Sequence, residues 1–215
     1  MLAVEPEAIG EEKMRAKAIV TMIGIVLGAL SGTGCVPDWA KNGDAPVVLL
    51  MTSVNNGNVL DSDVQISTGG VCPDAIPLRV ENHFKNPLVT VTGFRHDFTI
   101  ERYEVHYFRS DGRAVEGVDV PYSISGNLAL EVIEESTATL NLEVVRRQAK
   151  LEPPLRNLQN VGGAVIGGGN SIITMFAEIT LHARTTTGQT TNPVTARLQI
   201  DAADFGDTLT ACPTQ

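Results

Sequence analysis

The chain has 215 residues, a length that fits one domain of ordinary size or at most two small ones. Hydrophobic residues make up 43% of it, which is enough to bury a core and argues against wholesale disorder. The formal net charge of −9 argues against nucleic acid as a partner and against peripheral binding to anionic lipid, because both need a basic surface.

The N-terminal segment has the three-part pattern of a bacterial signal peptide. Residues 1–13 are acidic and polar, which does not suit the start of such a peptide. Met14-Arg15-Ala16-Lys17 is basic, and an apolar run from 18 to 30 and small residues from 31 to 34 follow it. The apolar run is shorter than the ~20 residues that a membrane-spanning helix needs. We therefore expect residues 1–34 to be a signal peptide whose true start is Met14, with an uncleaved anchor as the alternative.

The motif directly after the apolar run is Gly32-Thr33-Gly34-Cys35, which resembles the lipobox of bacterial lipoproteins. The resemblance covers residues 14–35, and Gly32 stands where that motif usually has Leu. It implies that signal peptidase II cuts before Cys35 and that Cys35 carries the lipid that attaches the protein to a membrane. Val36 replaces the Asp that retains such proteins in the inner membrane of enteric bacteria, which implies the outer membrane, on its periplasmic face or at the cell surface. The alternative is an ordinary signal-peptidase cut that leaves Cys35 as a free thiol.

The cysteine count agrees with export. The chain has three cysteines, Cys35, Cys72 and Cys212. If Cys35 carries lipid, an even pair remains in an oxidising compartment, which predicts a Cys72–Cys212 disulfide, with two buried free thiols as the alternative. Residues 35–44 read as a short tether, and residues 45–215 as a single domain.

The domain reads as all-β. Repeated runs alternate apolar and polar residues, and the turn between two of them is marked by Asp111-Gly112. Such one-sided alternation is typical of antiparallel sheets with one buried and one wet face. We expect an antiparallel β-sandwich of immunoglobulin-like topology, with one helix at 153–158 in a long connection. The expected strands are 45–54, 59–66, 76–82, 99–109, 128–133, 138–145, 172–183 and 194–200.

Three polar patterns are candidates for ligand sites. The Gly-rich stretch 162–170 lacks the Lys and the following helix of a phosphate-binding loop, so we interpret it as a connector. Acidic residues gather after the last strand and earlier in the chain, and they are weak candidates for Ca²⁺ ligands, with solvated acids as the alternative. The histidines never form a zinc pair such as H-x-x-x-H, so we expect surface imidazoles. These residues are Asp201, Asp204 and Asp207; Asp61 and Asp63; and His83, His96, His106 and His182.

One loop-like stretch carries aromatic residues. Phe94 and Phe98 flank Arg95, His96 and Asp97, and loops of this kind in sandwiches bind glycans or partner proteins. We expect these residues to pack at a sheet edge, with binding of a glycan or a partner protein as the alternative.

The sequence carries no catalytic motif and no cofactor fingerprint, so we expect neither enzyme activity nor a cofactor. The expected function is that of an exported, membrane-tethered lipoprotein acting as a binding or structural module of the bacterial cell envelope. Its expected partners are the membrane, through the lipid on Cys35, and an envelope protein or glycan. The alternative is a carbohydrate- or calcium-binding accessory domain.

Overall fold

The computed structural model describes residues 45–66, 68, 70–85, 95–161, 164–165, 171–191, 193–205 and 211–212. The predicted signal peptide, the tether, Cys35, Phe94 and Asp207 lie outside the described residues. Within the described ranges, no helix is long and apolar enough to cross a membrane.

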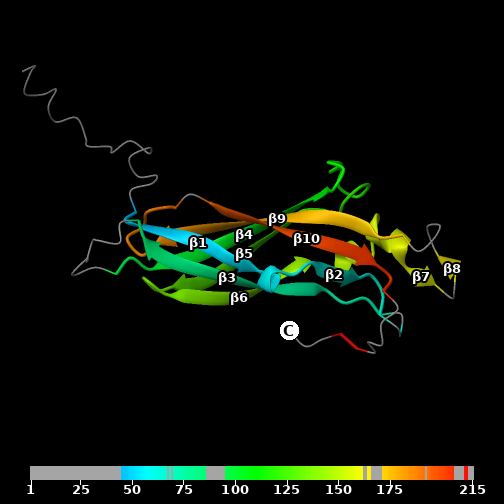
Figure 1. Cartoon of the computed structure of the whole chain (residues 1–215), viewed down its shortest axis with the longest axis horizontal. Helices are drawn as coiled ribbons and strands as arrows, with labels where there is room; N and C mark the ends of the chain where they lie inside the picture. The colour runs from blue at the N-terminus through cyan, green and yellow to red at the C-terminus, as the bar shows by residue number, and fades with distance from the viewer. Residues whose placement is uncertain are drawn as a thin grey trace, which may run out of the picture. The chain divides into compact units, whose positions relative to one another are not determined.

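Two β-sheets carry most of the described chain (Figure 1). The smaller sheet has the order β1-β3-β6 and is antiparallel throughout. The larger sheet has the order β2-β10-β9-β4-β5, in which β2 pairs in parallel with β10 and all other pairs are antiparallel. A separate ribbon is formed by β7 and β8. The strand bounds are β1 Val47–Val54, β2 Leu60–Asp63, β3 Asp74–Phe84, β4 Phe98–Arg109, β5 Ile124–Val132, β6 Thr137–Val145, β7 Asn160–Val161, β8 Ala164–Val165, β9 Ile173–Thr185 and β10 Val194–Ala203.

The two sheets pack face to face around an apolar core, which confirms the predicted all-β sandwich. In one half of the core, Leu49, Leu78 and Val80 of the smaller sheet meet side chains of β4 and β9. The other half gathers side chains of both sheets and of the connection after β6. The alternation in β9 follows the predicted pattern, with every second residue from Ile173 to Thr185 buried. This burial drives the two sheets together, because each contributes one apolar face.

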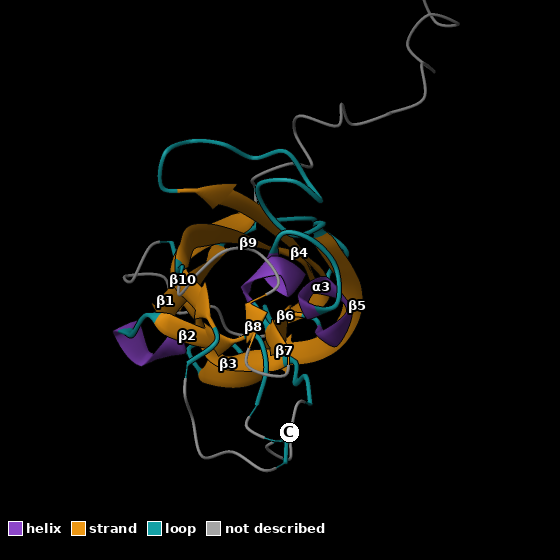
Figure 2. Cartoon of the chain, turned by 90° about the vertical axis from the view of Figure 1, so that its right-hand side faces the viewer, coloured by secondary structure: helices purple, strands orange, loops and turns teal. Residues whose placement is uncertain are grey.

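The ends of the sandwich are distinct. At one end, here called the proximal end, β1 begins and Val47 lies opposite Phe84. At the other, here called the disulfide end, β3 begins and β6 and β10 finish. Two short helical segments, α3 (Arg147–Lys150) and η2 (Leu155–Leu158), belong to this second end and can be seen in Figure 2. Leu155 and Leu158 are buried in the core, so these segments close that end of the sandwich.

Some predicted bounds differ from the observed ones. The helix expected at 153–158 is the 3₁₀ turn η2, and the α-helical turn α3 precedes it. Strand β5 begins at Ile124, earlier than predicted, because Gly126 and Asn127 supply no apolar side chain to reveal the alternation. The ring of Tyr103 lies over Gly126, its partner in the register, and replaces the missing side chain.

Candidate functional site

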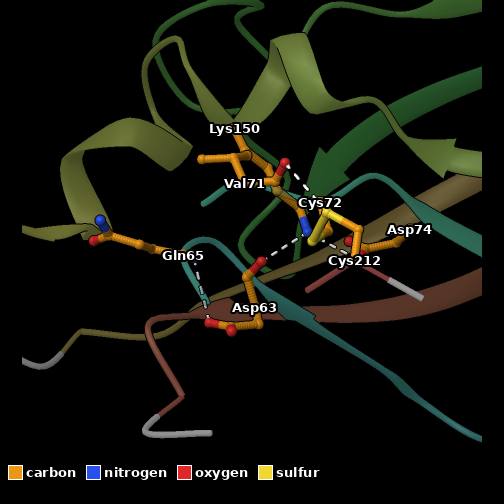
Figure 3. The surroundings of a disulfide bond; sticks show 7 residues. All are labelled: Asp63, Gln65, Val71, Cys72, Asp74, Lys150 and Cys212. Atoms are coloured by element: carbon orange, nitrogen blue, oxygen red, sulfur yellow. Dashed lines mark hydrogen bonds and ion pairs between the residues drawn. A yellow bond between two sulfur atoms is a disulfide. The ribbon is translucent and has the colours of Figure 1, made fainter. Parts of the chain in front are cut away.

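The predicted disulfide is present. Cys72, just before β3, is bonded to Cys212, after β10, with an S–S distance of 2.11 Å and a Cα–Cα distance of 5.4 Å (Figure 3). The bond joins residues 140 positions apart and ties the C-terminal segment to the first residues of β3. Cys72 is buried, so the bond is anchored in the body of the sandwich.

A buried ion pair lies beside the disulfide (Figure 3). The Lys150 side chain is 1% exposed, and its Nζ donates to Asp74 Oδ1 at 2.8 Å and to the backbone oxygen of Asp63 at 2.7 Å. The hydroxyl of Ser62 donates to the other carboxylate oxygen of Asp74 at 2.6 Å. Burial raises the pKa of Asp74, while the charge and hydrogen bond of Lys150 and the hydrogen bond from Ser62 act in the opposite direction.

The same connection is held by a second buried side chain. The Gln159 amide donates to the backbone oxygens of Val64 at 3.1 Å and Lys150 at 2.8 Å. Together, Lys150 and Gln159 fix the segment from α3 to η2 against β2 and the start of β3. The Lys150 amine is sealed from solvent and donates to two acceptors, so its role is to hold the disulfide end together. Sequence reasoning missed it, because Lys in a charged stretch such as Arg146-Arg147-Gln148-Ala149-Lys150 is usually exposed.

A ladder of charged side chains runs over the outer face of the larger sheet. Glu104 accepts from Arg102 at 2.8 Å, and its two carboxylate oxygens lie 3.7 Å from the imidazoles of His106 and His182. The two histidines that were expected on wet faces of different strands therefore share one carboxylate. Both lie on the outer face of the sheet, and neither lines the hollow beside β1 and β10 or the one between residues 122–124 and 146–152. The arrangement matches surface imidazoles in ion pairs.

The other two histidines lie toward the proximal end. His83 approaches Glu81 at 2.9 Å and Glu135 at 3.7 Å, and these contacts, the hydrogen bond to Glu81 first, raise the pKa of His83. His96 makes an edge contact with the ring of Phe84. Only His106 and His182 of the four therefore share a partner, Glu104.

An aromatic pair adjoins the charged ladder. Phe108 of β4 and Phe176 of β9 are direct partners in the register, and their rings stack with centroids 5.4 Å apart. The Arg197 guanidinium lies 5.2 Å from the centre of the Phe108 ring and donates to Glu178 at 3.0 Å. Both rings are half-buried, so their exposed parts form a small apolar surface on an otherwise polar face of the sheet.

Part of the stretch that the sequence pattern placed in an aromatic loop is buried in the sandwich. Phe98 is the first residue of β4 and is fully buried in the core, so it lies in a strand and not in a loop. Asp97 is also buried, where its carboxylate accepts from the backbone N–H of Glu134 at 2.8 Å. Alternation began to show only after Phe98, which is why the sequence placed this residue in a loop.

Two of the candidate aspartates, Asp63 and Asp201, accept hydrogen bonds from the protein itself. Asp201 accepts from Thr174 at 2.8 Å, and the Asp63 carboxylate accepts from the backbone N–H groups of Phe205 at 3.2 Å and Gln65 at 3.4 Å. Asp61 is exposed on β2. Among the described residues, no three His, Cys, Asp or Glu side chains lie close enough to hold a metal ion. With Asp207 outside those residues, a Ca²⁺ site here stays a weak prediction.

A serine–imidazole contact lies at the disulfide end of the charged ladder. Ser123 Oγ is 2.9 Å from His106 Nδ1, but its hydroxyl donates to Glu116, whose pKa is lowered by that hydrogen bond and by the one from the Ser123 backbone. The hydroxyl proton is therefore directed at a carboxylate and not at the imidazole. This geometry stabilises the loop between β4 and β5 and does not activate a nucleophile.

Comparison with known proteins yields little. No family model and no curated protein matches the chain. Among solved structures, the chain is similar to the solution structure of a candidate late embryogenesis abundant (LEA) protein, with 15% sequence identity, a TM-score of 0.37, and coverage of 94% of this chain and 95% of that chain. A likeness at this level carries no argument about function, which has to come from the residues themselves.

Proposed function

We propose that the protein is an exported lipoprotein, anchored to the cell envelope by lipid on Cys35, whose β-sandwich acts as a binding or structural module. The Cys72–Cys212 disulfide carries this proposal, because such bonds form and persist in oxidising compartments outside the cytoplasm. With two of the three cysteines joined, Cys35 alone remains, at the position where the lipobox-like motif calls for it.

The number of residues between Cys35 and the sandwich suits a short tether. The described residues begin at Ala45, which lies ten residues after Cys35. An extended chain spans at most ~3.3–3.6 Å per residue, so the proximal end would stay within about 35 Å of the anchor. Outer-membrane attachment, the processing of residues 1–34 and a single domain over 45–215 belong to the same proposal.

We also propose that the topology is immunoglobulin-like. Counting β1 and β2 as two halves of a first strand, the first, second and fifth strands form the smaller sheet. The third, sixth and seventh strands lie together in the larger sheet. This division supports the assignment, because the constant-type immunoglobulin fold places strands A, B, E and D in one sheet and C, F and G in the other. The fourth strand, β5, departs from that type, since it pairs with β4 in the larger sheet, and the β7–β8 ribbon is not included in the count.

Labelling in the native host tests the anchor. The full chain, Cys35→Ser and a control, Ser31→Ala, are grown with labelled palmitate and immunoprecipitated. We expect label on the wild type and on Ser31→Ala, and none on Cys35→Ser. Equal labelling of Cys35→Ser would remove lipidation from the proposal.

A carbohydrate-binding accessory role is the second candidate, favoured by the Phe108–Phe176 pair. The stacked rings lie beside Arg197 and Glu178, so they combine an apolar surface with hydrogen-bonding groups, which is what a sugar ring requires. Binding of purified cell-wall polysaccharide to the full chain tests it, with Phe108→Ala against Leu50→Ala as the control. Unchanged binding in Phe108→Ala, or none in the wild type, would reject this role.

A further inference from the structure

The outer edge of β1 borders a hollow at the proximal end of the sandwich. Strand β1 is an edge strand of the smaller sheet, and among the described residues no strand pairs with its outer edge. It lies beside β10 of the larger sheet (Figure 1 and Figure 2). Toward the disulfide end, β2 covers the edge of β10 by pairing with Ile200–Ala203. Toward the proximal end a hollow of about 330 Å³ remains, and its mainly apolar lining includes Val47, Leu49 and Val194.

The backbone of β1 is arranged to accept another strand at this edge. Lys85 N–H donates to the Pro46 oxygen at 2.8 Å, so Pro46 directs its backbone oxygen toward β3. Residues of an antiparallel strand alternate in this direction, and the register has no shift between Val47 and Met51. Val47 and Leu49 therefore direct their N–H and C=O groups toward the outer edge. The strand carries no charged side chain, which is a usual protection of an exposed edge.

The side chains of the same two residues point into the sandwich. Val47 is 1% exposed and Leu49 is 2% exposed. A residue of an added strand that pairs directly with Val47 lies on the same face of the sheet, so its side chain enters the hollow. The site therefore fits an extended segment with a large apolar side chain at that one position.

The chain itself supplies such a segment directly before β1. The described residues begin at Ala45, which lines the hollow, and Trp39 precedes it by six residues. Asn42-Gly43-Asp44 are residue types that form turns, and three residues are enough for a hairpin loop. Such a loop pairs Lys41 with Ala45. Two residues further along the hairpin, it pairs Trp39 with Val47, which is the position whose side chain enters the hollow.

We propose that residues 39–41 add to the outer edge of β1 as a short strand and that the Trp39 side chain fills the hollow. Aromatic side chains bury the largest apolar areas, so the indole stabilises this arrangement more than another residue of the segment could. The added strand also covers an uncharged edge that is otherwise open to pairing with a second chain. This inference goes beyond the proposed function and does not depend on lipid at Cys35, which palmitate labelling tests separately.

Fluorescence tests the docking, because Trp39 is the only tryptophan of the chain. The full chain is purified from its host as wild type, Val194→Phe and the control Leu50→Phe. The first variant fills the hollow, whereas Leu50 is exposed on the outer face of β1. We expect wild type and control to emit at a shorter wavelength than the chain in urea and to be quenched several-fold less by acrylamide. In Val194→Phe, emission and quenching should move toward those of the unfolded chain, while far-ultraviolet circular dichroism shows that the sandwich is folded.

Photo-cross-linking locates the segment even where Val194→Phe does not fold. A photoreactive amino acid replaces Trp39 in the otherwise unchanged full chain, and in a control it replaces Tyr122, which is exposed in the loop between β4 and β5. From position 39 we expect adducts within one chain, to peptides that contain residues 45–49 or 193–195. From position 122 we expect no adduct to these peptides.

Three kinds of result would overturn the proposal. The first is quenching of Trp39 that is as strong in the native chain as in urea. The second is a folded Val194→Phe whose Trp39 signal matches the wild type, as burial in detergent or lipid would produce. The third is an adduct from position 39 to another protein, to lipid, to a second copy of this chain or to a different part of the sandwich.

Discussion

Replacing Lys150 with Met is expected to destabilise the protein strongly. Met keeps most of the buried aliphatic stem but removes the ammonium that pairs with Asp74 at 2.8 Å and donates to the Asp63 oxygen. The Asp74 carboxylate, already largely buried, is then left without its counter-charge. Breaking a buried pair in this way typically costs about 3–5 kcal/mol. The control Arg147→Met changes an exposed neighbour in the same helical turn and should cost less than about 0.5 kcal/mol.

Urea unfolding of the full chain, followed by far-ultraviolet circular dichroism, measures the difference in unfolding free energy. The difference should also depend on pH. Burial raises the pKa of Asp74 above its ordinary value of 3.8, and loss of the Lys150 charge raises it further. A carboxyl whose pKa is higher in the folded state costs stability above that pKa, and the cost disappears as acidification protonates it.

The gap between wild type and Lys150→Met is therefore widest at neutral pH and narrows as the pH falls toward about 4. A loss of less than about 1 kcal/mol at neutral pH would contradict the structural role assigned to Lys150. A gap that does not change with pH would contradict the assignment of the penalty to the Asp74 carboxylate.

Three further outcomes are expected in the same unfolding assay. The pair Cys72→Ser and Cys212→Ser should lose up to about 5 kcal/mol, because the bond closes a long loop in the unfolded chain, and a loss near zero would contradict this. Gly126→Ala should cost about 1–3 kcal/mol, since the new methyl group meets the Tyr103 ring, and a neutral or stabilising result would show that the ring moves freely. Tyr107→Phe should cost about 1–3 kcal/mol, because it leaves a buried β6 carbonyl without its 2.6 Å hydrogen bond, with the exposed Tyr122→Phe as the control.

The charged groups on the larger sheet illustrate how a sheet brings distant residues together. Glu104 and His182 lie 78 positions apart along the chain, yet the pairing of β4 with β9 places them within 3.7 Å. The same register puts Phe108 opposite Phe176. Each residue was correctly assigned to a strand, but nothing in a strand's own pattern specifies which residue of another strand will face it.

The sequence by itself determined the class of fold and the pairing of the cysteines. Alternation in segments such as 173–185 reports directly which face is buried, and the domain from residue 45 onward has only two cysteines, which leaves a single possible pair within it. It also supplied the signal-peptide and lipobox interpretation of residues 14–35, which stays a prediction.

Only the tertiary structure decided the burial of Lys150, the stacked pair of phenylalanines and the hollow between β1 and β10. Lys150 is buried because Asp74 and the Asp63 oxygen, distant in sequence, satisfy its charge and donors. Phe98 is buried because it is the first residue of β4, one position before the start of the strand that the sequence pattern predicts. Local sequence patterns show which residues of a strand share a face. The partners of each side chain, the register between strands and the loops that meet at one end depend on how the two sheets pack together.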